Sequence, residues 1–521
     1  DNENNLTTTY AVDSKGDTVA TTIRQDGSQY YTYSLKTSDK DETILFDKVS
    51  LYGSDRNIHY VVDKDGRNNG VWRDNIRQNY RSAKEIYYDD LGRRTSEILY
   101  KGYLSGDELC DRNTTLLNVM YSYRDLPEYK TSNRITSMTI QGAGSYNKQF
   151  SYGYDGNGNI TQAGDVTYSY DQANQLDRVN DPENGTKTYV YDAGGNIASV
   201  REYDYTTGTL QAKTPKTTIT YGYDSVWKDK LISYNGNSIS YDAIGNPLHY
   251  YNGMTFTWKN GQQLSSIHQS SKTTVYKYDQ QGRRLSKKSS DSSTDVEYTY
   301  ADHLLTTLKD NRSGKFYIFY YDSDGRAISC AEYAGGGTYN YYYYVHNLHG
   351  DVIAILDSDG KVKVEYQYDA WGKILNRSHD GSEAGYYLSV NNPFRFRGYQ
   401  YDEDTGLYYL KSRYYDPTTG RFLNADSQFN NGLTKLNLFA YADNTPVNAI
   451  DSQGTDAIWL QDTDAVYGLG HSGALFQDST GIWYHFYWGA NGENSFLASG
   501  KKGEREIAVN LTARFFSNDT V

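Results

Sequence analysis

The sequence predicts an all-β protein, and composition and a recurring pattern both support that prediction. Among its 521 residues, tyrosine occurs 56 times and glycine 47 times, whereas proline occurs 7 times and methionine 3 times. Tyrosine favours pleated strands, and glycine marks turns. Apolar runs with a helical period are nearly absent, while a short hairpin-like pattern returns along much of the chain.

The recurring pattern is an aromatic residue, any residue, Tyr-Asp, two further residues, Gly, and then usually Asn or Arg. Side chains alternate between the two faces of a strand, so the tyrosines share one face, and Asp and Gly then turn the chain. One hairpin is marginal alone, but stacked hairpins bury a continuous face. Copies of the pattern have their aspartates at Asp89, Asp155, Asp192, Asp242, Asp279, Asp322 and Asp369, with degenerate copies at Asp171 and Asp224.

The stretch at residues 391–454 has a different texture. Three aromatic runs, Arg395–Arg397, Tyr408–Leu410 and Arg413–Tyr415, are separated by turn sequences rich in Asp, Thr, Pro and Gly. This arrangement predicts a β-meander of short strands. After it, Asn437–Tyr441 is expected to be buried, and the chain then leads to Asp451.

The sequences RYYDPTTGRFLNAD and LNLFAYADNTPVNAID within this stretch resemble the RHS-repeat-associated core, and the Tyr-Asp units resemble the YD repeats of RHS proteins. The family includes the C component of ABC toxins and the YD shell of teneurins. The resemblance implies that the hairpins spiral into a large hollow β shell, that the core segment closes it, and that a short β-hairpin region follows.

With this resemblance, we expect four regions. Residues 1–83 carry the pattern poorly and would be degenerate shell or a plug region. Residues 84–390 would form the YD-repeat shell, and 391–454 would be the RHS-repeat-associated core. Residues 455–521 would begin a variable, toxin-like C-terminal domain that ends prematurely here.

Asp426 and Asp451 are the strongest candidate catalytic pair. The resemblance implies that some RHS shells cut their own chain just after the core motif with aspartates at these positions. Two close carboxylates can share one proton and activate water, as in aspartic proteases. The usual ending of the motif is Asp-Pro-x-Gly-Leu, whereas Ser452 and Thr455 replace its Pro and Leu here. The alternative is that both aspartates cap turns that seal the shell.

Within 455–521, the hairpin that begins at His471 resembles the opening of circularly permuted papain-like hydrolases, in which such a His precedes the nucleophilic Cys. No Cys follows His471 in this sequence, so Cys-dependent catalysis cannot be completed within it. The alternative is a strand-initial His in an ordinary hairpin. Enzymatic activity is therefore expected to be at most autoproteolytic.

Neither of two metal-like patterns predicts a metal site. Asp155 begins a sequence similar to a calcium loop, but Ile160 and Val166 stand where the loop needs Gly and Glu, which favours a turn. His346 and His349 are three residues apart with no third ligand placed by the sequence, and the resemblance assigns them to the shell. We expect no metal and no cofactor.

Charge and cysteine content restrict the partners and the compartment. The formal net charge of −13 disfavours nucleic-acid binding by the shell. The two cysteines, Cys110 and Cys330, cannot make a disulfide framework. No apolar run is long enough to span a membrane, and the first residues lack the pattern of a signal peptide. A secreted or cell-surface location follows only from the resemblance, and we expect a fragment of a longer protein.

Two functions remain. The first is the delivery shell of a bacterial polymorphic toxin, which encloses or presents its own C-terminal effector and has an immunity protein as a further possible partner. The second is an extracellular adhesion module of the teneurin type that contacts a cell-surface glycan or protein, because tyrosine offers both a flat apolar face and a hydroxyl group.

Overall fold

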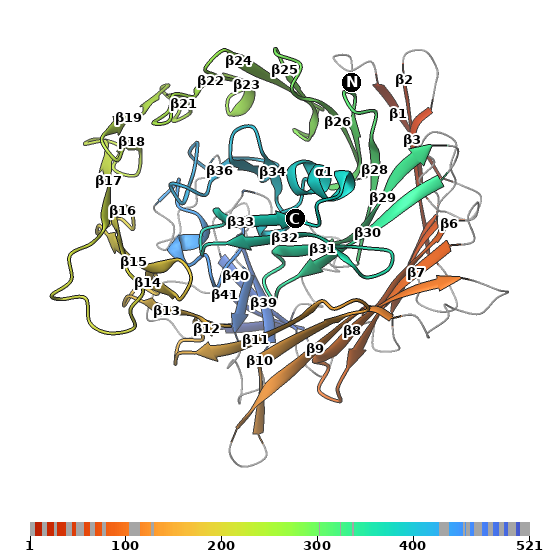
Figure 1. The fold of residues 1–521 in the computed structure, drawn as a ribbon, viewed down its shortest axis with the longest axis horizontal. Coiled ribbons are helices and arrows are strands. Elements are labelled where there is room, and N and C mark those ends of the chain that lie inside the picture. The colour runs from red at the N-terminus through yellow and green to blue at the C-terminus, as the bar shows by residue number, and fades with distance from the viewer. Residues whose placement is uncertain are drawn as a thin grey trace.

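A computed structural model describes residues 84–100, 115–124, 132–300, 303–322, 325–335, 338–426, 437–451 and 454 in full, together with the backbone of the other strands given below. The sequence-based prediction of an all-β fold is confirmed. Within each sheet, every strand pairs antiparallel with the next strand in the chain, and two long sheets curve around the core segment (Figure 1).

The first long sheet has 19 strands. They are β1 (Leu6–Val12), β2 (Thr18–Arg24), β3 (Gln29–Thr37), β4 (Ile44–Asp47), β5 (Asn57–Val62), β6 (Asn68–Asn75), β7 (Tyr80–Tyr88), β8 (Arg94–Tyr103), β9 (Thr115–Leu126), β10 (Lys130–Gly142), β11 (Asn147–Tyr154), β12 (Ile160–Ala163), β13 (Val166–Tyr170), β14 (Leu176–Asp181), β15 (Gly185–Tyr191), β16 (Ile197–Tyr203), β17 (Thr217–Tyr223), β18 (Leu231–Tyr234) and β19 (Asn237–Ser238).

The second long sheet has 14 strands and begins directly after the first. They are β20 (Ser240–Tyr241), β21 (Pro247–His249), β22 (Thr255–Lys259), β23 (Gln263–Gln269), β24 (Lys272–Tyr278), β25 (Arg284–Ser289), β26 (Asp295–Ala301), β27 (Leu304–Asp310), β28 (Phe316–Tyr321), β29 (Ala327–Gly335), β30 (Thr338–His346), β31 (Val352–Asp357), β32 (Val362–Tyr368) and β33 (Ile374–His379).

The remaining elements follow the second sheet. They are the helix α1 (Glu383–Asn391), the 3-10 turns η1 (Phe396–Gly398) and η2 (Ala442–Asn444), the four-stranded sheet β34 (Gln400–Asp402), β35 (Leu407–Tyr409), β36 (Tyr414–Asp416) and β37 (Arg421–Phe422), and the five-stranded sheet β38 (Trp459–Asp462), β39 (His471–Gln477), β40 (Trp483–Trp488), β41 (Asn494–Ala498) and β42 (Ile507–Asn510).

Each Tyr-Asp unit forms a hairpin turn whose aspartate caps the backbone. Oδ1 of Asp192 accepts hydrogen bonds from the N–H groups of Gly194 and Asn196 at 2.8 and 2.9 Å, and Oδ2 accepts one from the Asn196 side chain. Gly195 takes φ 74°, a left-handed conformation that glycine adopts without steric cost. The pairing register shifts between Val190 and the tyrosine that precedes the Asp, so the turn begins at a β-bulge.

The tyrosine before the aspartate links successive hairpins. The Tyr191 hydroxyl donates to the Leu176 carbonyl at 2.7 Å, near the start of the preceding strand, and Tyr368 donates to Val352 in the same way. The equivalent hydroxyls of Tyr154, Tyr170, Tyr223 and Tyr321 also donate to backbone carbonyls near the start of a preceding strand. Phenylalanine could not make this bond, which gives a physical reason for the repeated tyrosine.

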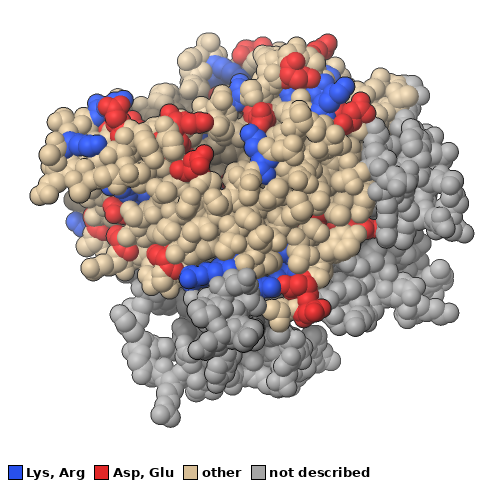
Figure 2. All heavy atoms as spheres, turned by 60° about the horizontal axis from the view of Figure 1, so that its bottom comes forward, with Lys and Arg blue, Asp and Glu red and all other residues tan. Residues whose placement is uncertain are grey.

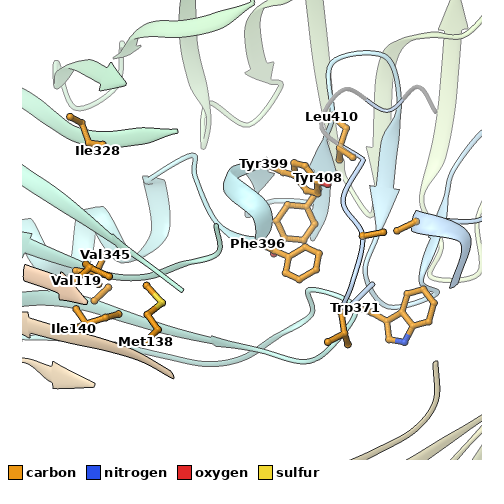
Figure 3. Packing of buried hydrophobic residues seen from close by; sticks show 14 of the residues in the cluster. Val119, Met138, Ile140, Ile328, Val345, Trp371, Phe396, Tyr399, Tyr408 and Leu410 are labelled. Atoms are coloured by element: carbon orange, nitrogen blue, oxygen red, sulfur yellow. The ribbon is translucent and has the colours of Figure 1, made fainter. Parts of the chain in front are cut away.

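The four short strands β34 to β37 lie inside the curve of the long sheets (Figure 1). Their aromatic side chains fill the interior, where Tyr408, Tyr415 and Tyr441 are fully buried. Figure 3 shows Phe396, Tyr399 and Tyr408 of this segment packed together, and Trp371, in the turn between β32 and β33, belongs to the same apolar cluster. The core segment is therefore the apolar centre around which the shell is wrapped.

One local expectation for residues 391–400 is wrong. The run Arg395–Arg397 is not a strand, because Arg397 has φ 54° and the chain makes the turn η1; the first strand of the meander is β34 instead. A helix, α1, also precedes this turn, and Ser382 caps it by accepting the N–H of Gly385. In the stretch Asn437–Tyr441, which was expected to be buried, Phe439 and Tyr441 are buried and the other three residues are partly exposed.

Acidic and basic side chains alternate on the face drawn in Figure 2, and no large area of a single sign covers the described residues there. Among the residues that the structure describes, no helix combines the length and apolar character needed to cross a bilayer. Cys330 is buried, and Cys110 lies outside the described residues.

Candidate functional site

Asp426 and Asp451 are brought together by a single arginine. Nη2 of Arg413 lies 2.8 Å from Oδ2 of Asp426 and 3.4 Å from Oδ2 of Asp451. Because both carboxylates contact the same Arg413 nitrogen, they lie side by side. The fold therefore brings together Asp426, which follows the last core strand, and Asp451, which lies at the end of the core motif.

All three charged residues are buried. Arg413, Asp426 and Asp451 are 4%, 8% and 6% exposed. The Arg413 guanidinium also lies over the Phe422 ring, 3.6 Å from its centroid, and Nη1 donates to the Leu438 carbonyl at 3.0 Å. Taking charges out of water is costly unless they are paired and hydrogen-bonded, so this arginine is the group that makes the burial of two carboxylates tolerable.

The same arginine holds the end of the core motif. Nε of Arg413 donates to the Gly454 carbonyl at 2.6 Å, and the Ser412 hydroxyl donates to the same oxygen at 2.6 Å. Gly454 has φ 69°, and a Cβ there would come within 2.6 Å of Oγ of Ser412. The glycine of the motif is thus required by both its backbone conformation and its close contact.

A pair of tyrosines completes the site from the other side. The backbone N–H of Asp451 donates to the Tyr399 hydroxyl at 3.0 Å, and the hydroxyls of Tyr399 and Tyr441 are 2.9 Å apart. Burial raises the pKa of Tyr399, and the neighbouring Tyr441 and Asp451 raise it further. Both phenols therefore stay neutral and serve as hydrogen-bonding groups at physiological pH.

This arrangement has a definite chemical character. Two ionised carboxylates and one guanidinium carry a combined charge of −1, so the arginine offsets part of the repulsion between the two acids. The carboxylates can accept protons from water, and the arginine polarises the Gly454 peptide group. Residues 452, 453 and 455–458, which flank Gly454, lie outside the described residues.

The sequence identified the two aspartates but missed Arg413, Ser412 and Tyr399 as parts of the same site. Arg413 was expected to belong to a short strand. A charged residue among consecutive aromatic residues was the available signal, because a buried arginine needs an acidic or carbonyl partner.

The other sequence-predicted candidates lie elsewhere. Oδ1 of Asp155 caps its own turn by accepting the N–H groups of Asn157 and Asn159, as the turn interpretation expects. His346 ends β30, and burial together with the charges of Arg326 and Lys84 lowers its pKa to about 3. His471 begins β39, but its side chain lies outside the residues described in full, so its role stays a prediction.

Comparison with known proteins identifies the repeat and the core. The family model described as "Teneurin YD-shell" matches residues 126–447. The tRNA3(Ser)-specific nuclease WapA of Bacillus spizizenii is 35% identical over 298 residues, which cover 56% of this chain and 12% of that protein. Double-stranded DNA deaminase toxin A of Burkholderia cenocepacia is 27% identical over 349 residues, or 60% of this chain and 23% of that protein.

Two further likenesses concern the shell. Teneurin-1 of Mus musculus is 28% identical over 293 residues, which cover 54% of this chain and 10% of that protein. The solved structure of TcdB2-TccC3-TEV matches with a TM-score of 0.52 and 17% identity over 86% of this chain and 27% of that one. At this identity the structural match shows a shared fold, and in each comparison this chain corresponds to a minor part of a much longer protein.

Proposed function

Because the chain belongs to the teneurin YD-shell family, we propose that it is the delivery shell of a bacterial polymorphic toxin, secreted or displayed at the cell surface. In this proposal the shell encloses or presents a C-terminal effector that begins near residue 455, and a separate immunity protein neutralises that effector in the producing cell. The relatives named as a nuclease and as a deaminase toxin support the assignment.

We further propose that the chain cuts itself close to the end of the core motif. Asp426 and Asp451 would activate the attacking water, and Arg413 would balance their charge while it holds the Gly454 carbonyl. The observation that carries this proposal is the convergence of both carboxylates and Gly454 on one guanidinium.

A denaturing gel tests the cleavage. The purified chain, incubated at neutral pH, should yield a large fragment ending near residue 455 and a small C-terminal fragment. Asp426→Asn should stay intact, whereas Asp291→Asn, which changes an exposed turn carboxylate, should be cut like the parent. A parent chain that stays full-length, or an Asp426→Asn chain that is cut equally well, would remove the proposed chemistry.

Limited proteolysis tests enclosure separately. If the shell surrounds the effector, the segment after residue 455 should resist an added protease while the shell is folded and become sensitive once urea unfolds it. Digestion of this segment at the same rate in both conditions would show that the effector is presented outside. His471 is the residue of that segment to which we assign an effector role, and His471→Ala should abolish the effector's activity in a chain that carries the whole effector.

A crevice gives the adhesion function its own supporting observation. Tyr168 and Tyr189 of the first sheet and Tyr368 of the second line it, together with the carboxylates of Asp181 and Asp369. The crevice holds only about 40 Å³, so it could receive the edge of a sugar and not a whole ring. Tyrosine offers both a flat apolar face and a hydroxyl for such a contact. A variant ending at Gly454 should then bind members of a glycan array, and Tyr168→Ala should weaken that binding. If neither protein binds any glycan, the toxin-shell proposal stands alone.

A further inference from the structure

A buried lysine lies between two carboxylates at the seam of the two long sheets. Nζ of Lys84 is 2.7 Å from Oε2 of Glu97 and 2.8 Å from Oδ2 of Asp322. The side chains of Lys84 and Glu97 are each 8% exposed, and that of Asp322 is 2% exposed. Ion pairs on a protein surface are common, but a lysine that contacts both an aspartate and a glutamate in the interior is unusual.

The three residues come from distant parts of the fold. Lys84 is on β7 and Glu97 is on the adjacent strand β8, whereas Asp322 follows β28 in the second sheet, 238 residues away from Lys84. Asp322 is the aspartate of a Tyr-Asp unit, and its Oδ1 caps the turn by accepting the Arg326 N–H at 2.9 Å. Its Oδ2 faces the lysine, whereas in the unit of Asp192 this oxygen bonds a side chain of its own turn.

Apolar side chains cover one side of the group. A cavity of about 40 Å³ beside it is lined by Leu99, Val119, Met138 and Ile328 among others. Figure 3 shows Val119, Met138 and Ile328 in this region, each extending from a different strand. Although burial acts against both charges, the pKa of Lys84 is raised and that of Asp322 is lowered because each lies beside the other, so the group rests as an ion pair. Proton transfer within the pair creates the neutral amine and neutral acid, the form that apolar surroundings penalise least.

We propose that Lys84 and Asp322 are joined by an intramolecular amide bond and that Glu97 is the proton-transfer group that promotes its formation. Lysine is a competent nucleophile once desolvated and deprotonated, and the folded chain holds its nitrogen in contact with the carboxyl group it attacks.

The reaction needs no external reagent. The unprotonated Nζ of Lys84 adds to Cγ of the protonated Asp322 carboxyl, so that a C–N bond forms. Glu97 accepts the proton released by the nitrogen and delivers it to the departing hydroxyl group, whose bond to Cγ breaks. One water molecule leaves, an amide remains, and no atom is oxidised or reduced.

The neighbouring charges determine which protonation state of Lys84 and Asp322 is present before the reaction. Before it, Asp322 and Glu97 hold the pKa of Lys84 above its usual value although burial acts in the opposite direction. Reaction therefore proceeds from the neutral form of the pair, which a proton transfer from Lys84 to Asp322 creates. The other polar groups that face it are Arg94, Tyr121, Arg326 and His346, of which His346 stays neutral because burial lowers its pKa to about 3.

A second group supplies a comparison within the same chain. Nζ of Lys187 lies 3.2 Å from Oε1 of Glu202 and 3.7 Å from Oδ2 of Asp369, which is again the aspartate of a Tyr-Asp unit in the second sheet. These side chains are 21%, 34% and 14% exposed. Because the nitrogen is farther from the carboxyl group and water reaches it, this group should remain an ion pair.

Such a bond would close a covalent loop that contains most of the shell. The loop would fasten the first described strand of the repeat region to the second sheet, so the two sheets could not separate at this seam even after local unfolding. Cross-links that close long loops restrict the unfolded chain most, and the shell would gain resistance to denaturant and protease accordingly.

Mass spectrometry of the full chain under denaturing conditions tests the proposal. The folded parent, or its large fragment where the chain has cut itself, should be lighter than its own sequence by one water, about 18 Da. Digestion should release a branched peptide that joins Lys84 to Asp322. Lys84→Arg and Glu97→Gln should have the full sequence mass, whereas Lys187→Arg should retain the loss. Asp322→Asn should lose ammonia, about 17 Da, in place of water if the amine attacks this side chain.

Folding is checked independently by far-UV circular dichroism on each variant. A parent that has the β spectrum and the full sequence mass would overturn the proposal, as would a water loss that persists in Lys84→Arg. A branched peptide centred on Lys187 would show that burial and distance are the wrong criteria.

Discussion

Replacing Arg413 with methionine should destabilise the core more than any surface ion-pair change. Methionine keeps much of the length and apolar contact of the arginine, including packing near Phe422, but carries no charge. Asp426 and Asp451 would then face each other in the interior without their shared partner, and the Gly454 carbonyl would lose one of its two donors. The variant therefore isolates the electrostatic role of the guanidinium.

The magnitude follows from the burial of the three residues, which are all less than a tenth exposed. Removing one partner of a buried ion pair costs about 3–5 kcal/mol, because an uncompensated charge remains in the interior. In the double variant Arg413→Met/Asp426→Asn, only one carboxylate has lost the guanidinium. We expect it to recover about 1–2 kcal/mol relative to the single variant, since repulsion between the two carboxylates has been removed.

Urea unfolding followed by far-UV circular dichroism gives the free energies, with the midpoint and slope fitted for each variant. Lys216→Met is the control: Lys216 pairs with Asp204 on the surface, where both side chains are mostly exposed, and its change should stay within about 1 kcal/mol. If Arg413→Met unfolds within about 1 kcal/mol of the parent, or if Asp426→Asn brings no recovery in the double variant, then Arg413 does not act as the counter-charge described here.

Two further predictions concern a pair of glycines and one buried carboxyl group. Gly372→Ala and Gly282→Ala both place a Cβ at a left-handed φ, which costs about 1–2 kcal/mol. Only the Gly372 Cβ would also meet Phe396, whose Cδ1 lies 2.5 Å away, so urea unfolding should show an additional loss of about 1–3 kcal/mol for Gly372→Ala. Equal losses of stability in the two variants would contradict this prediction. Burial raises the pKa of Asp351 to about 6, so the carboxyl binds a proton more tightly in the folded chain than in the unfolded one, and folding stability should fall by about 3 kcal/mol as the pH rises from about 4 to about 6. Asp351→Asn should lack this loss in urea unfolding measured across the same range, and an unchanged pH profile would show that another group titrates there.

The sequence was sufficient for features that local chemistry determines. A Tyr-Asp unit specifies its turn through the capping carboxylate and the left-handed glycine, as at Asp192 and Gly195, whatever surrounds it. The helix α1 was missed because nine residues that include Gly385 give little helical periodicity. Ser382 before an acidic residue was the one available signal for its N-terminus.

The error at Arg395–Arg397 has a different cause. Two arginines around a phenylalanine look like an exposed–buried–exposed strand, but Arg395 is itself fully buried. Its guanidinium donates to the carbonyls of Ser389 and Val390 at the end of α1, which fixes the turn in place of a strand. The last carbonyl groups of a helix need hydrogen-bond donors from outside the helix. Here that need outweighs the strand propensity of the run, and the residues form a turn.

Contacts between successive windings of the shell lie beyond what the sequence pattern can specify. In a solenoid with equal repeats, the residue that faces a given position on the next winding is fixed by the period. Here the hairpins differ in length, so nothing in the pattern states that Lys84 meets Asp322 or that Lys187 meets Asp369. The same holds in the core, where Arg413, Asp426 and Asp451 converge only because the chain folds back inside the shell. The residues that bear chemistry in this protein are therefore the ones whose partners come from distant segments, and the repeated units provide the fixed frame that brings those segments into contact.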